Sequence, residues 1–201
     1  MKAQPRRYAN LLAEVRAGRA RRILEVGTYK GAHAEAMIRA AAEFWPAEQV
    51  EYYGLDLFGP APAAEHTPRT QAPDIEIVRA RLEATGARVV LVKGDSRETF
   101  PRLCRRLPKM GIIFIDGGHS EATIESDWLC ARGLMGFDTS VIFDDHWNYP
   151  GGGGCNKLIA ELAGSGKYDV NLLEPMDRFA RPYGFLEIRF ARVRLREALA
   201  A

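Results

Sequence analysis

The stretch ILEVGTYKGAHAEAM, residues 23–37, joins a short apolar run to a glycine turn and then to a helical pattern. Glycine lets the backbone turn tightly and approach a ligand, and the helix start that follows offers unpaired N–H donors. Gly27 and Gly31 are spaced as G-x-x-x-G, whereas a dinucleotide pyrophosphate calls for G-x-G-x-x-G. The turn therefore favours a ligand whose polar end is an amino acid, although such turns also close many βα units that bind nothing.

Outward from this stretch, short apolar runs alternate with amphipathic ones, which is typical of a parallel sheet flanked by helices. The pattern predicts an α/β fold with the strands Arg22–Val26, Val50–Asp56, Arg88–Lys93, Gly111–Asp116, Ser140–Asp144, Tyr168–Leu173 and Gly184–Leu195. The predicted helices are Ala32–Phe44, Ile75–Thr85, Arg97–Arg106, Glu121–Gly133 and Asn156–Ala163. No helical pattern precedes the last strand, so we expect it to pair antiparallel. We interpret residues 1–201 as a single domain, with a helical extension over 1–20 and the core over 21–195.

The composition limits the partners that this chain can have. The 28 Lys and Arg nearly balance the 26 Asp and Glu, and a net charge of +2 argues against nucleic acid or a membrane surface. We expect a small-molecule acceptor instead, with assembly into a homo-oligomer left open. We interpret the basic residues near the start as a solvated helix face; they are Arg6, Arg7, Arg16, Arg19, Arg21 and Arg22.

The three cysteines are widely spaced and form no CxxC pair. This usage indicates a reducing compartment and excludes a disulfide framework or a zinc knuckle. The first residues lack the apolar core of a signal peptide, and no apolar run reaches transmembrane length. We therefore predict a cytoplasmic protein.

Candidate ligand contacts follow three consecutive strands, at the edge where open α/β sheets bind ligands: the glycine turn follows the first strand, and polar residues follow the second and third. Asp56 ends the second strand, at the distance from the glycine turn where a carboxylate accepts hydrogen bonds from ribose hydroxyls. Asp95 and Ser96 end the third strand, where a polar side chain can meet an adenine amino group. Each of these residues could instead cap a helix, so the three sites count together rather than singly.

Carboxylates and histidines follow the fourth and fifth strands. Asp116 should lie close to the Asp144-Asp145 pair, because the ends of neighbouring parallel strands meet. Carboxylates crowded together raise one another's pKa unless a cation neutralises them, and oxygen ligands suit Mg²⁺ or another hard divalent ion. His119 and His146 flank the cluster and can act as bases near neutral pH. The alternative is that the aspartates cap the following loop and His146 packs against a neighbouring ring.

Two irregular segments also follow strand ends. Phe58–Asp74 contains four prolines, and Trp147–Cys155 contains NYPGGGG. Irregular loops of this length at a ligand-binding edge are candidate substrate loops, although they could also be tolerated insertions.

Five motifs in order carry a resemblance to class I S-adenosylmethionine (SAM)-dependent methyltransferases: ILEVGTYKGAHAEAM, YYGLDLF, VKGDSRETFP, IIFIDGGHS and VIFDDHW. The chain most closely resembles the branch that contains macrocin-type and aminocoumarin-sugar O-methyltransferases, over roughly residues 20–195. The resemblance implies a Rossmann-like three-layer α/β sandwich whose seven-stranded sheet has the order 3-2-1-4-5-7-6. It implies a cofactor site formed by Glu25, Gly27, Thr28, Gly31, Asp56, Leu57, Gly94, Asp95, Ser96 and Asp116.

The resemblance also implies that Asp116, Asp144 and Asp145 bind a divalent metal such as Mg²⁺, with Asp116, His119 and His146 as catalytic residues. Such a metal would hold two adjacent hydroxyls of the acceptor and lower the pKa of one. Several metal-dependent relatives have a carboxylate at the position of Gly118, where it can act as the base. Here either His119 is the base, or the metal-bound oxygen needs none, or the metal assignment is wrong.

The leading hypothesis is O-methylation of a small hydroxylated acceptor, with a sugar or another secondary metabolite favoured by the resemblance. Metal-independent N- or O-methylation stays open, because an amine acceptor would not need the metal. A metal-dependent hydrolase would use the same aspartates, but it lacks a phosphate-binding lysine motif and gives Asp56 no role. A cofactor-binding module without catalysis is the third alternative, and Gly118 is the residue that keeps it open.

Overall fold

The computed structural model describes residues 5–59 and 74–196. Its strands are β1 Arg22–Val26, β2 Glu51–Asp56, β3 Arg88–Lys93, β4 Met110–Ile115, β5 Met135–Trp147, β6 Tyr168–Leu172, β7 Asp177–Arg181 and β8 Gly184–Leu195. Its α-helices are α1 Tyr8–Ala17, α2 Ala32–Ala41, α3 Ile75–Glu83, α4 Ser96–Cys104, α5 Glu121–Ala131 and α6 Asn156–Gly164. Two short 3₁₀ helices span Ala47–Gln49 and Arg132–Leu134.

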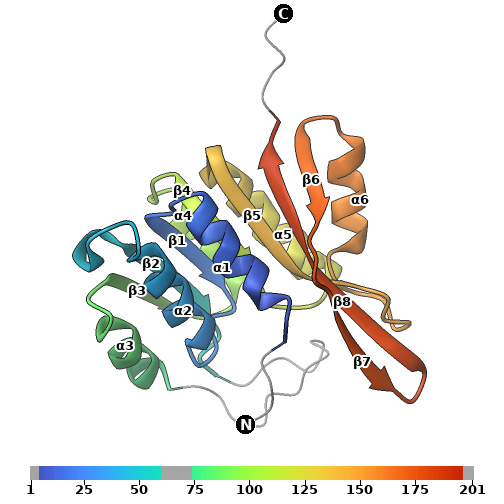
Figure 1. The fold of residues 1–201 in the computed structure, drawn as a ribbon, viewed down its shortest axis with the longest axis horizontal. Coiled ribbons are helices and arrows are strands. Elements are labelled where there is room, and N and C mark those ends of the chain that lie inside the picture. The colour runs from blue at the N-terminus through green and yellow to red at the C-terminus, as the bar shows by residue number, and fades with distance from the viewer. Residues whose placement is uncertain (1–4, 60–73, 197–201) are drawn as a thin grey trace, which may run out of the picture.

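These strands form one sheet in the order β3-β2-β1-β4-β5-β8-β6, with β7 paired to β8 (Figure 1). The strands β1 to β5 are parallel, and β8 runs antiparallel to β5, β6 and β7. The predicted order is therefore confirmed, because β8 is the strand that we expected to be the seventh. The β7 strand was not predicted, and it forms with β8 a hairpin that projects from the body of the sheet (Figure 1).

Helices cover both faces of the sheet (Figure 1). The helices α1, α2 and α3 pack in one hydrophobic cluster, and α4, α5 and α6 pack in another. Strand β4 contributes side chains to both clusters. Ile112 and Phe114 belong to the first cluster, and Ile113 and Ile115 belong to the second. Side chains alternate along a strand, so a central strand that is buried on both faces is apolar throughout.

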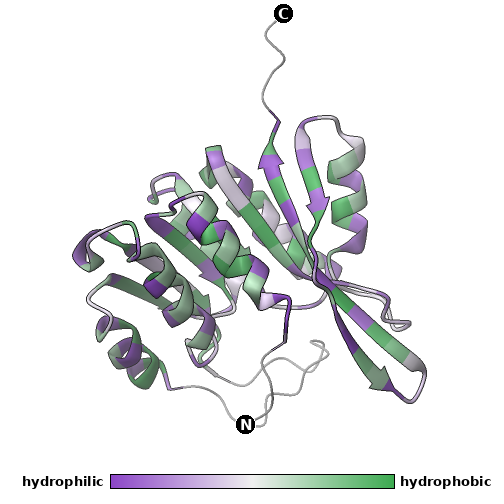
Figure 2. Ribbon diagram, viewed as in Figure 1, coloured by the Kyte–Doolittle hydropathy of each residue, from purple (hydrophilic) through white to green (hydrophobic). Residues whose placement is uncertain are grey.

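Strand β8 has a different pattern, because much of it lies nearer the solvent. Hydrophilic and hydrophobic residues alternate along the β7–β8 hairpin (Figure 2). Leu186, Ile188 and Phe190 are buried, and Phe185 is exposed. This alternation predicted the strand and its boundaries, which the structure reproduces.

Capping side chains set the start of three helices. Asp74 accepts a hydrogen bond from the backbone N–H of Glu76 at the start of α3, and Asp95 accepts one from Arg97 at α4. Ser120 accepts one from Thr123 at α5. These caps pair N–H groups that a helix start leaves without a partner. None of the helices in the described ranges is long and apolar enough to cross a membrane.

The N-terminal helix α1 lies on the same side of the sheet as α2 (Figure 1). Leu11 and Val15 are its buried apolar residues. Its later turns are also held by charge: Glu14 accepts hydrogen bonds from Arg192 and Arg194 of β8, at 3.0 and 2.8 Å. The predicted helical extension is thus part of the packed structure.

Candidate functional site

The turn after β1 requires glycine for a steric reason. Gly27 has a φ of +98°, and a Cβ atom there would overlap the backbone carbonyl of Asp116. Gly31, at φ +73°, is the residue from which α2 begins. Positive φ is costly for residues with a side chain. The G-x-x-x-G spacing therefore serves the close approach of β1 and β4 as well as any ligand.

Glu25, the last but one residue of β1, is a buried carboxyl group with a tyrosine partner. It is 1% exposed, and Tyr52 of β2 donates its hydroxyl hydrogen bond to Glu25 Oε2. The Tyr52 oxygen also lies 3.1 Å from Thr28 Oγ1. Burial raises the pKa of Glu25 from 4.5 to about 8; the Tyr52 bond opposes this shift and the charge of Asp56 adds to it. Glu25 is therefore mostly protonated at neutral pH.

This shift makes stability depend on pH. The pKa of Glu25 in the folded chain is about 8 against an ordinary value of 4.5, so its contribution to folding is complete below 4.5 and is lost as the pH rises through 8. We expect the loss to be on the order of 1 kcal/mol per pH unit inside this window. Glu25→Gln cannot ionise, so it should flatten the pH dependence of the free energy of unfolding.

Urea unfolding of wild type and Glu25→Gln at pH 5, 7 and 9 measures this difference. The exposed residue Glu48 provides the control, because Glu48→Gln should follow wild type at every pH. Parallel stability curves for wild type and Glu25→Gln would show that Glu25 is ionised in the folded chain.

Asp56 at the end of β2 is held by two backbone donors. The N–H of Tyr29, in the turn after β1, donates to Asp56 Oδ2 at 2.7 Å, and the N–H of Phe58 donates to Oδ1 at 2.9 Å. The N–H of Gly94, after β3, donates to the backbone carbonyl of Asp56 at 2.9 Å. The ends of β1, β2 and β3 thus meet at Asp56, which is 5% exposed. Leu57 follows it at the same edge.

Asp95 and Ser96 lie at the start of α4, where the alternative role as a cap is observed for Asp95. Its carboxylate accepts the backbone N–H of Arg97 at 2.9 Å and also pairs with the guanidinium of Arg97. This pair and the backbone bond lower the pKa of Asp95. A contact of Asp95 or Ser96 with adenine remains a prediction.

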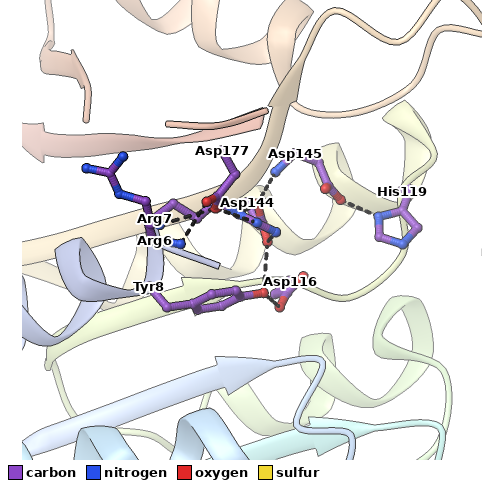
Figure 3. Close-up of polar contacts among 8 residues, drawn as sticks. All are labelled: Arg6, Arg7, Tyr8, Asp116, His119, Asp144, Asp145 and Asp177. Atoms are coloured by element: carbon purple, nitrogen blue, oxygen red, sulfur yellow. Dashed lines mark hydrogen bonds and ion pairs between the residues drawn. The ribbon is translucent and has the colours of Figure 1, made fainter. Parts of the chain in front are cut away.

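The aspartates of β4 and β5 come together as predicted (Figure 3). The Tyr8 hydroxyl lies 3.2 Å from Asp144 Oδ2 and 3.5 Å from Asp116 Oδ2, so one group reaches both carboxyls. Burial raises the pKa of Asp116 well above its ordinary value, and the charges of Asp144 and Asp145 add to the shift. This is the mutual repulsion expected of crowded carboxylates.

A side chain from outside the predicted site neutralises Asp144. The Arg7 guanidinium donates from Nε to Asp144 Oδ1 at 2.9 Å and from Nη2 to Oδ2 at 2.8 Å (Figure 3). Arg7 is 7% exposed and also donates from Nη1 to Asp177 Oδ2 at 3.0 Å. The interpretation of Arg7 as part of a solvated helix face is therefore wrong. Its apolar stem and guanidinium are enclosed because two buried carboxylates bind the charge.

Asp145, the next residue, binds a histidine instead. Its Oδ2 is hydrogen-bonded to His119 Nδ1 (Figure 3). Asp145 has a φ of +60° and lies where the pairing of β5 with β8 is irregular. The backbone change turns the side chain of Asp145 toward His119 and that of Asp144 toward Arg7 (Figure 3).

The glycine-rich loop that follows β5 contacts this pair. The N–H of Gly154 donates to the carbonyl of His119 at 2.9 Å, and the N–H of Cys155 donates to the carbonyl of Asp145 at 3.1 Å. The rings of His119 and Trp147 are 5.7 Å apart. Trp147–Cys155 therefore lies against the candidate base, as a substrate loop would. Most of the other predicted loop, Phe58–Asp74, lies outside the described residues.

His146 lies beyond the irregularity in β5, opposite Arg189 of β8. Burial lowers the pKa of His146, and the charge of Arg189 lowers it further. In the described ranges it has no hydrogen bond to the aspartates, in contrast to His119. Its catalytic role remains a prediction.

Comparison with known proteins identifies the family. A family model described as a methyltransferase domain matches residues 24–146, which is more than half of the chain. This chain belongs to that family. The matched range begins in β1 and ends in β5, so it contains every aspartate and histidine of the site described above except Asp177. A search of curated protein sequences found no significant match.

Solved methyltransferases share the fold. The O-methyltransferase TomG from Streptomyces achromogenes, in complex with SAM, has a TM-score of 0.67 at 19% identity over 94% of this chain and 79% of TomG. An O-methyltransferase from Bacillus cereus, in complex with SAH, gives 0.67 at 17% identity over 97% and 83%. The calicheamicin methyltransferase CalS11 gives 0.62 at 20% identity over 90% and 76%. At these identities the likeness establishes the fold.

The metal site predicted for this methyltransferase does not fit the arrangement found. Within residues 5–59 and 74–196, no three His, Cys, Asp or Glu side chains are placed to hold a metal ion. The physical reason is that Arg7 and Tyr8 take the oxygen atoms of Asp144, and His119 takes an oxygen of Asp145. Proximity of the carboxylates was predicted; their protein partners were not.

Sequence reasoning missed four residues of this site: Arg7, Tyr8, Tyr52 and Asp177. Arg7 and Tyr8 pair with residues more than one hundred positions away, and nothing in the local sequence indicates this. Tyr52 could have been suspected, since a tyrosine two residues from a glycine in a buried strand needs a partner for its hydroxyl.

Proposed function

We propose that this chain is a SAM-dependent methyltransferase that transfers the methyl group to a hydroxyl of a small acceptor, with His119 as the base. The observation that carries the proposal is the His119–Asp145 pair at the same sheet edge as the glycine turn and Asp56. Glycosylated or hydroxylated small molecules supply acceptors of this class. By its printed name, CalS11 is a TDP-rhamnose 3'-O-methyltransferase, so a sugar hydroxyl is the acceptor that we favour.

The residues at the edge fit SAM in their chemistry. Glu25 offers a buried carboxyl group beside the Gly27 turn, and the positive charge of the methionine amino group would lower its pKa, so that Glu25 would bind that group as a carboxylate. Asp56 would accept hydrogen bonds from the ribose hydroxyls, because the N–H groups of Tyr29 and Phe58 hold its oxygens in place. Gly94, hydrogen-bonded to Asp56, would lie near adenine with Asp95 and Ser96. When bound, SAM supplies an electrophilic methyl group on a sulfonium centre.

His119 and Asp145 would remove the proton of the acceptor. With its proton on Nδ1 directed at Asp145, the ring carries its lone pair on Nε2, and the carboxylate stabilises the imidazolium that forms. With SAM bound, the acceptor oxygen would bond to the methyl carbon as the carbon–sulfur bond breaks and its electron pair stays on sulfur, and Nε2 of His119 would take the hydroxyl proton. The products are a methyl ether and S-adenosylhomocysteine (SAH). No step of this proposal uses a metal ion, because the aspartate cluster does not fit one.

Asp56→Ala tests the cofactor half of the proposal. Losing hydrogen bonds to a charged group should cost about 1.5–3 kcal/mol of affinity for SAH. Isothermal titration calorimetry with SAH measures the loss directly. Asp138→Ala is the matched control, since Asp138 is exposed near the start of β5 and should leave the affinity unchanged.

Melting temperatures of both variants separate a lost contact from a lost fold, because Asp56 also binds two backbone N–H groups. Unchanged SAH affinity in a folded Asp56→Ala variant would remove Asp56 from the site. Tighter binding of NAD than of SAH by wild type would contradict the choice of SAM.

A further inference from the structure

Asp144 has its hydrogen-bonding capacity filled by the chain itself. A carboxylate offers about four acceptor positions, two on each oxygen. Oδ1 accepts Arg7 Nε at 2.9 Å and the N–H of Asp145 at 2.7 Å. Oδ2 accepts Arg7 Nη2 at 2.8 Å and the Tyr8 hydroxyl at 3.2 Å. Any further ligand of Asp144 would have to displace one of these donors.

Arg7 is held in this position from several sides. Asp177, the first residue of β7, accepts the backbone N–H groups of Arg6 at 2.7 Å and Arg7 at 3.2 Å, and also Arg7 Nη1. The guanidinium carbon lies 4.8 Å from the ring centre of Tyr8 and 5.6 Å from that of Phe190. Two carboxylates and two rings therefore surround one cation.

The ring of Tyr8 is also held in place by its neighbours. Its ring is stacked on His33 of α2, with centroids 3.8 Å apart and planes at 4°, and meets Phe190 edge-on. Burial lowers the pKa of His33 to about 4, and the charge of Arg7 lowers it further, so His33 adds no second charge at neutral pH. The Tyr8 hydroxyl can therefore reach Asp144 and Asp116 from a ring that is held in one orientation.

We propose that the guanidinium of Arg7 takes the place of a divalent cation in this site, so that the folded chain excludes such ions from Asp116, Asp144 and Asp145. The positive charge that crowded carboxylates require comes from the N-terminal segment, in a bidentate pair that a metal ion could not share. A divalent ion would also meet the repulsion of a buried guanidinium. This exclusion of divalent ions does not depend on which acceptor the protein methylates.

The same geometry predicts that removing Arg7 creates a divalent site. Arg7→Met keeps a side chain of similar length and no charge. It frees one acceptor position on each oxygen of Asp144, next to the Asp116 carboxyl that the same Tyr8 hydroxyl reaches. Oxygen ligands of this kind suit Mn²⁺ and Mg²⁺. Arg6→Met is the matched control, because the Arg6 side chain is exposed and points away from the aspartates (Figure 3).

Mn²⁺ binding, followed as the loss of the free-ion electron paramagnetic resonance signal, tests the proposal without any methyl transfer. We expect wild type and Arg6→Met to bind no Mn²⁺ in the site up to roughly 1 mM. Arg7→Met should bind one ion at a concentration about tenfold below that limit or lower. The double variant Arg7→Met with Asp144→Asn should lose the gained binding. Binding by wild type that Asp144→Asn abolishes would overturn the proposal, and so would the absence of binding in both wild type and Arg7→Met.

A variant that does not fold still gives an answer. If Arg7→Met is unfolded without metal, Mn²⁺ should restore its native circular dichroism spectrum, because the ion neutralises the carboxylates that the guanidinium neutralised. Failure of Mn²⁺ to restore the fold would count against the proposal. A failure to bind SAH would instead contradict the proposed function and leave the Mn²⁺ result unaffected.

Discussion

His119→Ala is expected to lower the turnover of methyl transfer by about 10²–10⁴-fold, which is the usual contribution of a general base. The bond from Nδ1 to Asp145 holds the ring in the tautomer that accepts a proton at Nε2, and alanine removes this group while leaving the cofactor contacts intact. Turnover is followed as SAH formed with an acceptor on which wild type is active, found from a panel of nucleotide sugars. The affinity for SAH should stay within a factor of about two.

His146→Ala is the matched control, because it removes the same side chain one residue beyond Asp145. If His119 alone is the base, turnover of His146→Ala should stay near that of wild type, since within the described residues His146 pairs in register with Arg189 and has no hydrogen bond to Asp144 or Asp145. A large loss in His146→Ala with none in His119→Ala would assign the base to His146. Asp145→Asn keeps a hydrogen bond to Nδ1 without the charge, so it should lower turnover less than His119→Ala and shift the pH profile.

Most of the fold could be predicted from sequence, because the residue patterns that mark its strands and helices are local. Strands β1, β3 and β8 have the predicted boundaries, since each is a short apolar or alternating run between turn residues. The β5 strand is longer than predicted, running from Met135 to Trp147, because it still pairs with β4 at Met135 and with β8 at His146 and Trp147, beyond the apolar run at its centre. The short strand β7 was missed because DRFAR has no clear alternation, and its pairing with β8 is what makes it a strand.

The site could be predicted from sequence only in part. Topology brings together the ends of β1, β2, β4 and β5, so sequence could place Glu25, Asp56, Asp116 and the Asp144-Asp145 pair at one edge. It could not place Arg7, which lies 137 positions from Asp144 and belongs to a basic run of ordinary appearance. The expected metal followed from the crowded carboxylates and from the family resemblance, and neither indicates an arginine beside them. Tertiary packing supplies a cation from the chain instead, and no spacing rule indicates which arginine it would be.

Arg7→Met is expected to lower the free energy of unfolding by about 3–5 kcal/mol, because breaking a buried ion pair leaves its partners charged and unpaired. Arg7 stabilises two buried carboxylates, Asp144 and Asp177, and anchors the start of α1 to β5 and β7. Urea unfolding of the metal-free protein at pH 7 measures the loss. Arg6→Met should stay within about 0.5 kcal/mol of wild type, as exposed substitutions do.

The pH dependence of the same variant shows whether the loss comes from the uncompensated charge. Burial raises the pKa of Asp144 even with Arg7 present, and Asp145 adds to the shift; without the guanidinium the pKa must rise further. A carboxyl group whose folded pKa is raised contributes stability at low pH and loses it as the pH rises through that pKa. The destabilisation of Arg7→Met should therefore shrink as the pH falls from 8 toward 5.

A double-mutant cycle then isolates the pair. Adding Asp144→Asn to Arg7→Met removes the buried charge that the single variant exposes, so the double variant should be more stable than the two separate losses predict. With its oxygen at the Oδ1 position, asparagine still accepts the N–H of Asp145, and its NH2 group at the Oδ2 position can donate to the Tyr8 hydroxyl oxygen, which limits new unpaired groups. Additive losses with no pH dependence would show that Arg7 stabilises the fold by packing against Tyr8 and Phe190 rather than by charge. The guanidinium would then contribute by filling space in the core, and the negative charge of the aspartates would have to be neutralised by protonation.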